Sequence, residues 1–182
     1  AESGVDARGL HPSQEAIDEA HPDVRARLVV GSATDPVDGR FDLVTCIGVL
    51  EQLSPSDAQQ AIDSMCAATD RILFSSTPGG FDDPARINVR PPSEWAAWFA
   101  ERGFYRRTDV DGTFLTPSTA LFERAELTPR AIVDRYEGML APLMTEVVEK
   151  REALLEASRR LAEAGGAVRV VQLDDDAILA RH

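Results

Sequence analysis

The sequence contains few cysteines and few histidines, which limits the kinds of site that it can form. Its 182 residues include two cysteines, Cys46 and Cys66, and three histidines. So few cysteines exclude a disulfide-stabilised scaffold, and both lie in apolar surroundings, so we expect buried thiols in a cytoplasmic protein. The scattered histidines and cysteines offer no ligand spacing, so we predict no metal site.

Basic residues are also scarce. Lys and Arg number 19 against 31 Asp and Glu, which gives a formal net charge of −12. Nucleic acids and anionic membrane surfaces both select basic faces, so we expect neither as a partner. No apolar run is long enough to cross a bilayer, and the polar, acidic start is unlike a signal peptide. These absences favour a cytoplasmic location.

What the sequence does contain is an alternation of strand and helix patterns over its first two thirds. Hydrophobic residues make up 43% of the chain, enough for a core. The continuous apolar run Asp42–Ile47 is typical of a buried parallel strand. Together with the other runs it predicts an α/β fold with a mostly parallel, Rossmann-like sheet. The expected strands are Ala7–Leu10, Arg27–Val30, Asp42–Ile47, Arg71–Ser75, Phe104–Asp109 and Thr119–Arg124.

The helix signals are local and specific. Ser54 is a good N-cap, followed by Pro55 at the first helical position, and predicts a helix that ends near Ala68. Two further helices are expected at Ser13–Ala20 and Ser93–Arg102. Trp95 and Trp98 lie on one side of the last of these helices and are expected in the core. No helix separates the last two strands, so we expect them to pair antiparallel.

The pattern changes after residue 125, where we place a domain boundary between residues 1–125 and 126–182. Residues 129–164 predict one long amphipathic helix with Thr128 as N-cap. Its apolar residues recur every seven positions, which indicates a coiled coil, a homodimer or partner contact through residues 129–164, or a helix packed onto the domain. The recurring residues are Val133, Leu140, Val147, Leu154 and Leu161. A strand-like run follows at Val168–Leu173.

Several motifs, in order, resemble class I S-adenosylmethionine (SAM)-dependent methyltransferases. The run FDLVTCIGVLEQL at residues 41–53 is similar to the fourth strand of that family and its turn. RILFSSTP at 71–78 is similar to the next strand and loop, and GVDARGLHPS at 4–13 to the second strand. Val30–Ala33 looks like the turn after the third strand. Residues 87–91 with Trp95 are similar to a loop and helix of glycan and natural-product methyltransferases.

The resemblance implies SAM as cofactor, provided that the segment missing from the pattern is supplied, and O-methylation of a sugar or small-molecule hydroxyl. It implies cofactor binding by His11, Ser32, Ala33, Gly48 and Val49. Glu51, Asn88 and Arg90 are the residues that it implies for binding a small-molecule or glycan acceptor. Four of these residues also have a structural alternative. His11 could be a turn residue, Glu51 a helix-entry acid, and Asn88 and Arg90 residues that stabilise their loop.

The chain also departs from the family pattern. No counterpart of the first strand and its Gly-rich turn precedes residue 4. His11 stands where a carboxylate usually binds the ribose diol, and Gln52, where His is common, cannot take up a proton. The catalytic base therefore stays unassigned. A second reading, a non-catalytic methyltransferase-like module that assembles through residues 129–164, stays open beside the enzyme.

The missing first strand would leave backbone groups unpaired inside the sheet. Four arrangements would resolve this. A longer parent polypeptide supplies the strand, Val168–Leu173 folds back into the sheet, a neighbouring chain donates a strand, or the second and fourth strands of the pattern pair directly. We rank the parent polypeptide first and the fold-back second.

Overall fold

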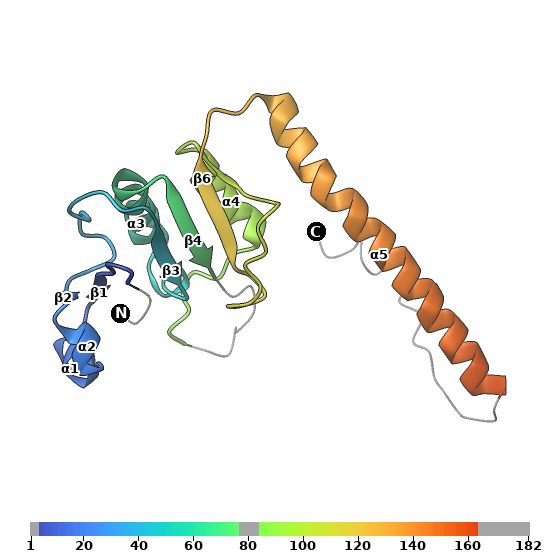
Figure 1. Cartoon of the computed structure of the whole chain (residues 1–182), viewed down its shortest axis with the longest axis horizontal. Coiled ribbons are helices and arrows are strands. Elements are labelled where there is room, and N and C mark those ends of the chain that lie inside the picture. Colours follow the sequence, from blue (N-terminus) through green and yellow to red (C-terminus); the bar gives the residue numbers. More distant parts are fainter. Residues whose placement is uncertain (1–3, 77–83, 164–182) are drawn as a thin grey trace. The chain divides into compact units, whose positions relative to one another are not determined.

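The computed structural model describes residues 4–76 and 84–163, which form an α/β unit and a long helix (Figure 1). Backbone contacts divide the chain into two compact units, Ala1–Leu127 and Thr128–His182. None of the helices within the described residues combines the length and the apolar character needed to cross a bilayer. The predicted strand Val168–Leu173 lies outside the described residues.

The first unit begins with a small two-stranded sheet. Strand β1 (Gly9–His11) runs parallel to β2 (Leu28–Val30), with His11 opposite Val30. Two short helices, α1 (Gln14–Glu19) and α2 (Pro22–Arg25), connect them. The side chain of Ser13 caps α1 by accepting from the Ala16 N–H. The connection between β1 and β2 is therefore long enough to join two parallel strands, as the alternation of strand and helix patterns predicts.

A second sheet holds four strands in the order β3-β4-β6-β5. They are β3 (Val44–Ile47), β4 (Arg71–Ser75), β5 (Phe104–Arg106) and β6 (Ala120–Arg124). Strands β3 and β4 are parallel, and β6 is antiparallel to both β4 and β5. Three of the four strands therefore point the same way, and the predicted antiparallel pairing of the last two strands is confirmed.

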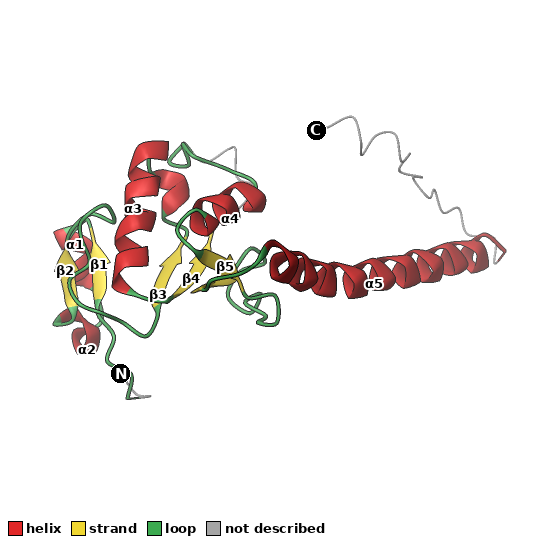
Figure 2. Cartoon of the chain, turned by 90° about the horizontal axis from the view of Figure 1, so that it is seen from above, coloured by secondary structure: helices red, strands yellow, loops and turns green. Residues whose placement is uncertain are grey.

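Two helices cover one face of this sheet (Figure 2). Helix α3 (Pro55–Ala68) follows a 3-10 turn, η1 (Leu50–Gln52), and α4 (Pro92–Ala100) precedes β5. The Ser54 side chain accepts from the Asp57 N–H at 3.2 Å, so the predicted N-cap is confirmed. It satisfies one of the amide groups that the first turn of a helix leaves unpaired.

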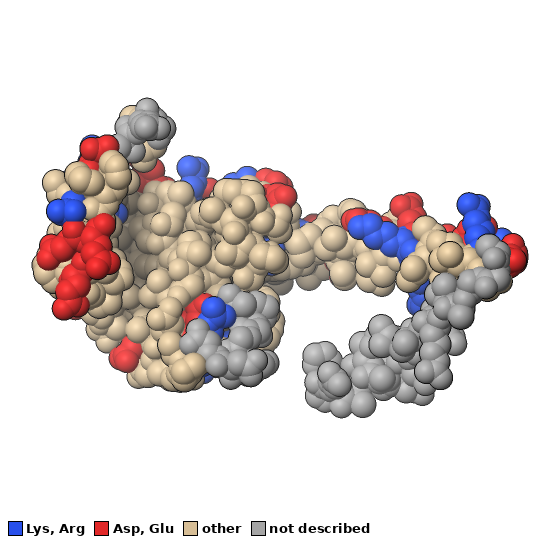
Figure 3. Space-filling model, turned by 90° about the horizontal axis from the view of Figure 1, so that it is seen from below, with Lys and Arg blue, Asp and Glu red and all other residues tan. Residues whose placement is uncertain are grey.

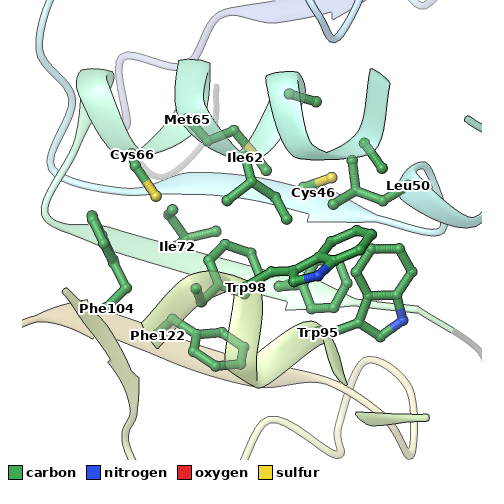
Figure 4. Packing of buried hydrophobic residues seen from close by; sticks show 14 of the residues in the cluster. Cys46, Leu50, Ile62, Met65, Cys66, Ile72, Trp95, Trp98, Phe104 and Phe122 are labelled. Atoms are coloured by element: carbon green, nitrogen blue, oxygen red, sulfur yellow. The ribbon is translucent and has the colours of Figure 1, made fainter. Parts of the chain in front are cut away.

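The core lies between this face and the two helices (Figure 4). Trp95 and Trp98 are both buried, as predicted, and their rings meet edge-on with centroids 5.2 Å apart. Phe99 stacks on Phe122 of β6 at 4.4 Å between centroids. Because side chains alternate along a strand, Thr45 and Ile47 point to the opposite face, where both are exposed.

The two sheets do not join. In Figures 1 and 2, β1 lies on the side of the small sheet that is nearer β3, yet the two strands belong to different sheets. Direct pairing of the second and fourth strands of the family pattern, one of the four arrangements that the sequence left open, is therefore wrong for this structure. Each sheet ends in an edge whose backbone groups need a partner.

The second unit contains helix α5 (Pro129–Glu163), close to the predicted bounds. Its N-terminus is capped as predicted, with the Thr128 hydroxyl accepting from the Ala131 N–H at 3.2 Å. Pro142 lies inside the helix. No residue of α5 is buried within the described part of the chain. Ile132, Tyr136 and Met139 are half-buried, whereas most of its other large apolar residues are exposed.

Candidate functional site

The predicted cofactor residues all follow strands at their carboxyl ends. His11 ends β1, Ser32 and Ala33 follow β2, and Gly48 and Val49 follow β3. The Gly31 N–H donates to the His11 carbonyl at 3.1 Å, so the segments after β1 and β2 start side by side. Carboxyl ends of parallel strands are where α/β sheets bind ligands.

The His11 ring takes part in the turn into α1. Its Nδ1 accepts a hydrogen bond from the Ser13 N–H at 3.1 Å, and the residue is exposed. His21 repeats this geometry before α2, where its Nδ1 accepts from the Asp23 N–H at 3.4 Å. The His11 contact with Ser13 is the one expected if His11 is a turn residue. Contact between His11 and a cofactor ribose stays a prediction.

The segment after β2 is fastened to helix α3. The Ser32 N–H donates to Asp35 Oδ2 at 2.7 Å, which closes a tight turn. From α3, Gln60 donates to the Thr34 carbonyl at 3.1 Å and Ser64 to the Asp35 carbonyl at 2.5 Å. Ala33 packs, half-buried, against the core cluster. These contacts hold the small sheet in a defined place beside α3.

Gly48 makes the turn that follows β3. Its φ of +69° lies in the left-handed region that only glycine adopts freely. Its N–H donates to the Ser75 carbonyl at 2.9 Å, and its carbonyl accepts from Gln52 Nε2 at 2.8 Å. An added Cβ on Gly48 would meet no atom nearer than Glu51 Oε1 at 3.8 Å. The backbone here is therefore open to close approach by a bound molecule, as a cofactor cradle requires.

Glu51 is almost completely buried at the start of η1 and lies near Cys46. Burial, and then the Glu51 carboxylate, raise the pKa of the Cys46 thiol to about 12. Cys66 is also buried, and both thiols are free, as predicted.

Asn88 and Arg90 form a network with this turn. The Asn88 N–H donates to the Glu51 carbonyl at 3.0 Å, and its Nδ2 donates to the Leu50 carbonyl at 3.3 Å. Arg90 Nε donates to Asn88 Oδ1 at 2.6 Å. Its guanidinium also pairs with Glu94 and lies 4.4 Å from the centroid of the Trp98 ring. These contacts are those of the loop-stabilising alternative, and acceptor binding by both residues stays a prediction.

The structure thus gathers the predicted residues in two groups. In the first group, Gly48 and Val49 lie in the turn that leads to Glu51, whose carbonyl accepts from the Asn88 N–H. In the second group, His11 lies beside the Gly31–Ser32 turn, since its carbonyl accepts from the Gly31 N–H. Both groups are anchored on the same core cluster, because Ala33, which follows the Gly31–Ser32 turn, and Val49 both pack against it. Figure 3 shows that the surface between the small sheet and the larger sheet is hollowed and largely uncharged.

A cluster of hydroxyl groups that no sequence motif marks lies at the same sheet end. Ser75 Oγ lies 2.5 Å from Thr116 Oγ1 and 3.1 Å from Ser118 Oγ. Thr116 Oγ1 is also 2.9 Å from Thr119 Oγ1. Ser75 ends β4 beside Gly48, whereas the other three precede β6. Only the antiparallel register of β4 and β6 brings them together, and the sequence alone gives no signal for it.

Other features do not extend the site. Among the described residues, no group of three or more His, Cys, Asp or Glu is placed to hold a metal ion. A surface cavity of about 550 Å³ lies at the opposite end of β4, around Asp70 and Arg71. The charged side chains that line this cavity pair with one another, for example Arg124 with Asp70 at 2.8 Å. We therefore interpret the cavity as part of a surface ion-pair network.

Comparison with solved structures identifies the fold of the chain. No protein-family model and no curated protein matches the chain. Among solved structures, magnesium protoporphyrin IX methyltransferase from Synechocystis PCC 6803 with bound S-adenosylhomocysteine (SAH) aligns with a TM-score of 0.53 and 17% identity, over 69% of this chain and 67% of that one. The same enzyme with bound SAM gives 0.52 and 16%, over 69% and 62%.

The chain therefore spans about two thirds of the length of those methyltransferase chains. Identity at this level supports a shared fold and leaves activity open. The α/β, Rossmann-like fold class predicted from the sequence is confirmed, together with the long C-terminal helix. The described elements have the fold of class I methyltransferases.

Proposed function

We propose that the chain is the larger part of a SAM-dependent methyltransferase that acts on a hydroxyl group of a sugar or another small molecule. The fold supports this proposal: the described elements align with a methyltransferase of known structure, and the predicted cofactor residues lie at the carboxyl ends of β1, β2 and β3. When bound, SAM supplies an activated methyl group. The protein then has to bind and align the two reactants, which is itself a large catalytic contribution.

Different residues of the chain would bind the cofactor and the acceptor. The Gly48 backbone has room for an approaching molecule, and the turn after β2 is held to α3 by the hydrogen bond from Gln60 to the Thr34 carbonyl. Gly31 is already closely packed, because an added Cβ would lie 2.7 Å from Leu10 Cδ1. The fit is therefore best at Gly48. Glu51 and the Asn88 loop would orient the acceptor, with the base unassigned.

The proposal includes a strand between β1 and β3. We place it in polypeptide outside residues 1–182, and fold-back of Val168–Leu173 is the alternative. Such a strand would pair with the edges of both sheets and turn them into one. Leu10 of β1 and Ile47 of β3, the two strands at these edges, are 44% and 39% exposed, which supports the same idea, since a strand between them would reduce that exposure. A cytoplasmic location is part of this proposal.

Calorimetric titration with SAH tests the proposal through a matched pair of variants. His11→Asp supplies the carboxylate that the family pattern has at this position, and Asp can accept the same Ser13 N–H. It should bind SAH more tightly than the unaltered chain, by about tenfold, the effect of roughly 1.4 kcal/mol. His21→Asp, a histidine in the same kind of turn, should leave the affinity unchanged.

Absence of SAH binding by the chain and by His11→Asp would contradict a cofactor site formed by these residues alone. It would favour the second candidate function, a non-catalytic assembly module. The observation behind that candidate is that large apolar side chains between Val133 and Leu161 of α5 are exposed within the described part of the chain.

A further inference from the structure

Within the described part of the chain, helix α5 carries a row of exposed large apolar side chains. Val133, Val147 and Leu154 are 56%, 59% and 63% exposed. A soluble helix of 35 residues normally buries one such face, because packing of that face supplies most of its stability. Exposed apolar surface on this scale marks an interaction site.

The apolar residues form a seam with a seven-residue repeat. One row holds Val133, Leu140, Val147, Leu154 and Leu161, and the other row holds Tyr136, Leu143, Lys150 and Ala157. A repeat of seven keeps both rows on one side of the helix and matches the pairing of two helices in a coiled coil. Lys150 is the one charged residue in these two rows.

The charges of α5 suit a second copy of the same helix. Residues 129–163 contain six basic and seven acidic side chains, whereas the whole chain has a net charge of −12. Two copies of α5 therefore meet without the repulsion that the rest of the acidic chain would cause. Several of these charges already pair along the helix, including Arg159 with Glu156 and Lys150 with Glu146.

Lys150 decides the orientation of the pair. In a parallel pair it would face Lys150 of the second copy, with Arg151 alongside, and like charges would crowd the seam. In an antiparallel pair centred near Thr145, it would face Leu140 instead. Its ammonium group lies 2.5 Å from Glu146 of its own helix, so its carbon stem is free to pack.

The antiparallel register also matches the remaining residues. It sets Leu143 opposite Val147, Tyr136 opposite Leu154, and Val133 opposite Ala157. At the edge of the seam it brings Glu137 next to Arg151 of the second copy, twice by symmetry. Both side chains are exposed in the structure. We propose that α5 pairs with α5 of a second copy of this chain in an antiparallel coiled coil.

Sedimentation at several protein concentrations tests the pairing. The chain should sediment as a dimer that dissociates on dilution. Val147→Glu places a charge in the seam and should raise the dissociation constant by at least about a hundredfold, while the matched variant Thr145→Glu, on the outer face, should leave it unchanged. A monomer at all concentrations, or a dimer that Val147→Glu leaves intact, overturns the proposal.

A charge exchange tests the orientation. Glu137→Arg and Arg151→Glu should each weaken the dimer several-fold, because each sets like charges side by side, and the double variant should restore it. In a parallel pair Arg151 would lie next to Glu146 of the second copy and Glu137 next to Ile132, so the double variant would stay weak. That result overturns the antiparallel arrangement. Neither measurement depends on cofactor binding, so the outcome is independent of the methyltransferase proposal.

Discussion

Arg90 Nε donates a 2.6 Å hydrogen bond to Oδ1 of Asn88, while the Asn88 amide N–H donates to the carbonyl of Glu51. These two residues therefore connect helix α4 to the turn after β3. The sequence singled out all three as acceptor-binding residues. The structure shows that they form one connected unit, in which a change at Arg90 is expected to reach Glu51 through Asn88.

We predict that Arg90→Ala destabilises the chain by about 2 kcal/mol, since it removes hydrogen bonds to a charged group and the packing of that group on Trp98. Chemical denaturation measures the effect. Arg8→Ala is the control, because Arg8 is exposed, and its unfolding free energy should stay within about 0.5 kcal/mol of the unaltered chain. Equal stability of Arg90→Ala and Arg8→Ala would show that the Arg90 contacts do not hold the loop.

The N-cap of α3 gives a second prediction. Ser54→Ala removes the acceptor for the Asp57 N–H and should cost about 1 kcal/mol of unfolding free energy. Ser93→Ala, in the exposed first turn of α4, makes the same chemical change away from a cap and should cost much less. Thermal and urea unfolding of both variants would check this, and a cost for Ser93→Ala equal to that for Ser54→Ala would argue against the capping role.

Local signals account for the parts of the fold that the sequence predicted well. Strand β4 (Arg71–Ser75) and the start of α3 have the predicted bounds, because an apolar run and a Ser-Pro cap act over a few residues. Strand β5 ends at Arg106, three residues before the predicted Asp109. There Arg107 pairs with both Asp109 and Glu123 of β6, and the chain leaves the sheet.

The site was harder to predict because its contacts join distant segments. The hydroxyl cluster pairs Ser75 with Thr116, and the Asn88 side chain donates to the Leu50 carbonyl. Neither contact has a signature in the spacing of the residues. The resemblance to methyltransferases gave the positions of the turns, whereas the hydrogen bonds that each turn forms had to come from the structure.

The buried thiols predict a loss of stability at alkaline pH. Burial raises the pKa of Cys46 and of Cys66 from 9.0 to about 12 in the folded chain. Between those values the unfolded chain releases the thiol protons and the folded chain keeps them, so the stabilisation that is complete below pH 9 is lost as the pH rises. Cys46→Ala/Cys66→Ala should therefore show a flatter decline of unfolding free energy between about pH 8 and pH 11. An identical decline in both proteins would contradict protonated buried thiols.

Two glycines should respond to alanine with opposite signs. Gly48→Ala forces a side chain into the left-handed region at φ +69° and should cost about 1 kcal/mol or more, although the added Cβ has room. Gly138→Ala lies within α5, where an added Cβ meets nothing within 4 Å, and should stabilise the helix by about 1 kcal/mol. Circular dichroism would follow α5, and denaturation of the α/β unit would follow Gly48. Because the two substitutions are chemically identical, the difference between them isolates the backbone conformation. If Gly48→Ala proved neutral, the turn after β3 would have to adopt another conformation in solution, and the open backbone proposed for the cofactor would lose its support.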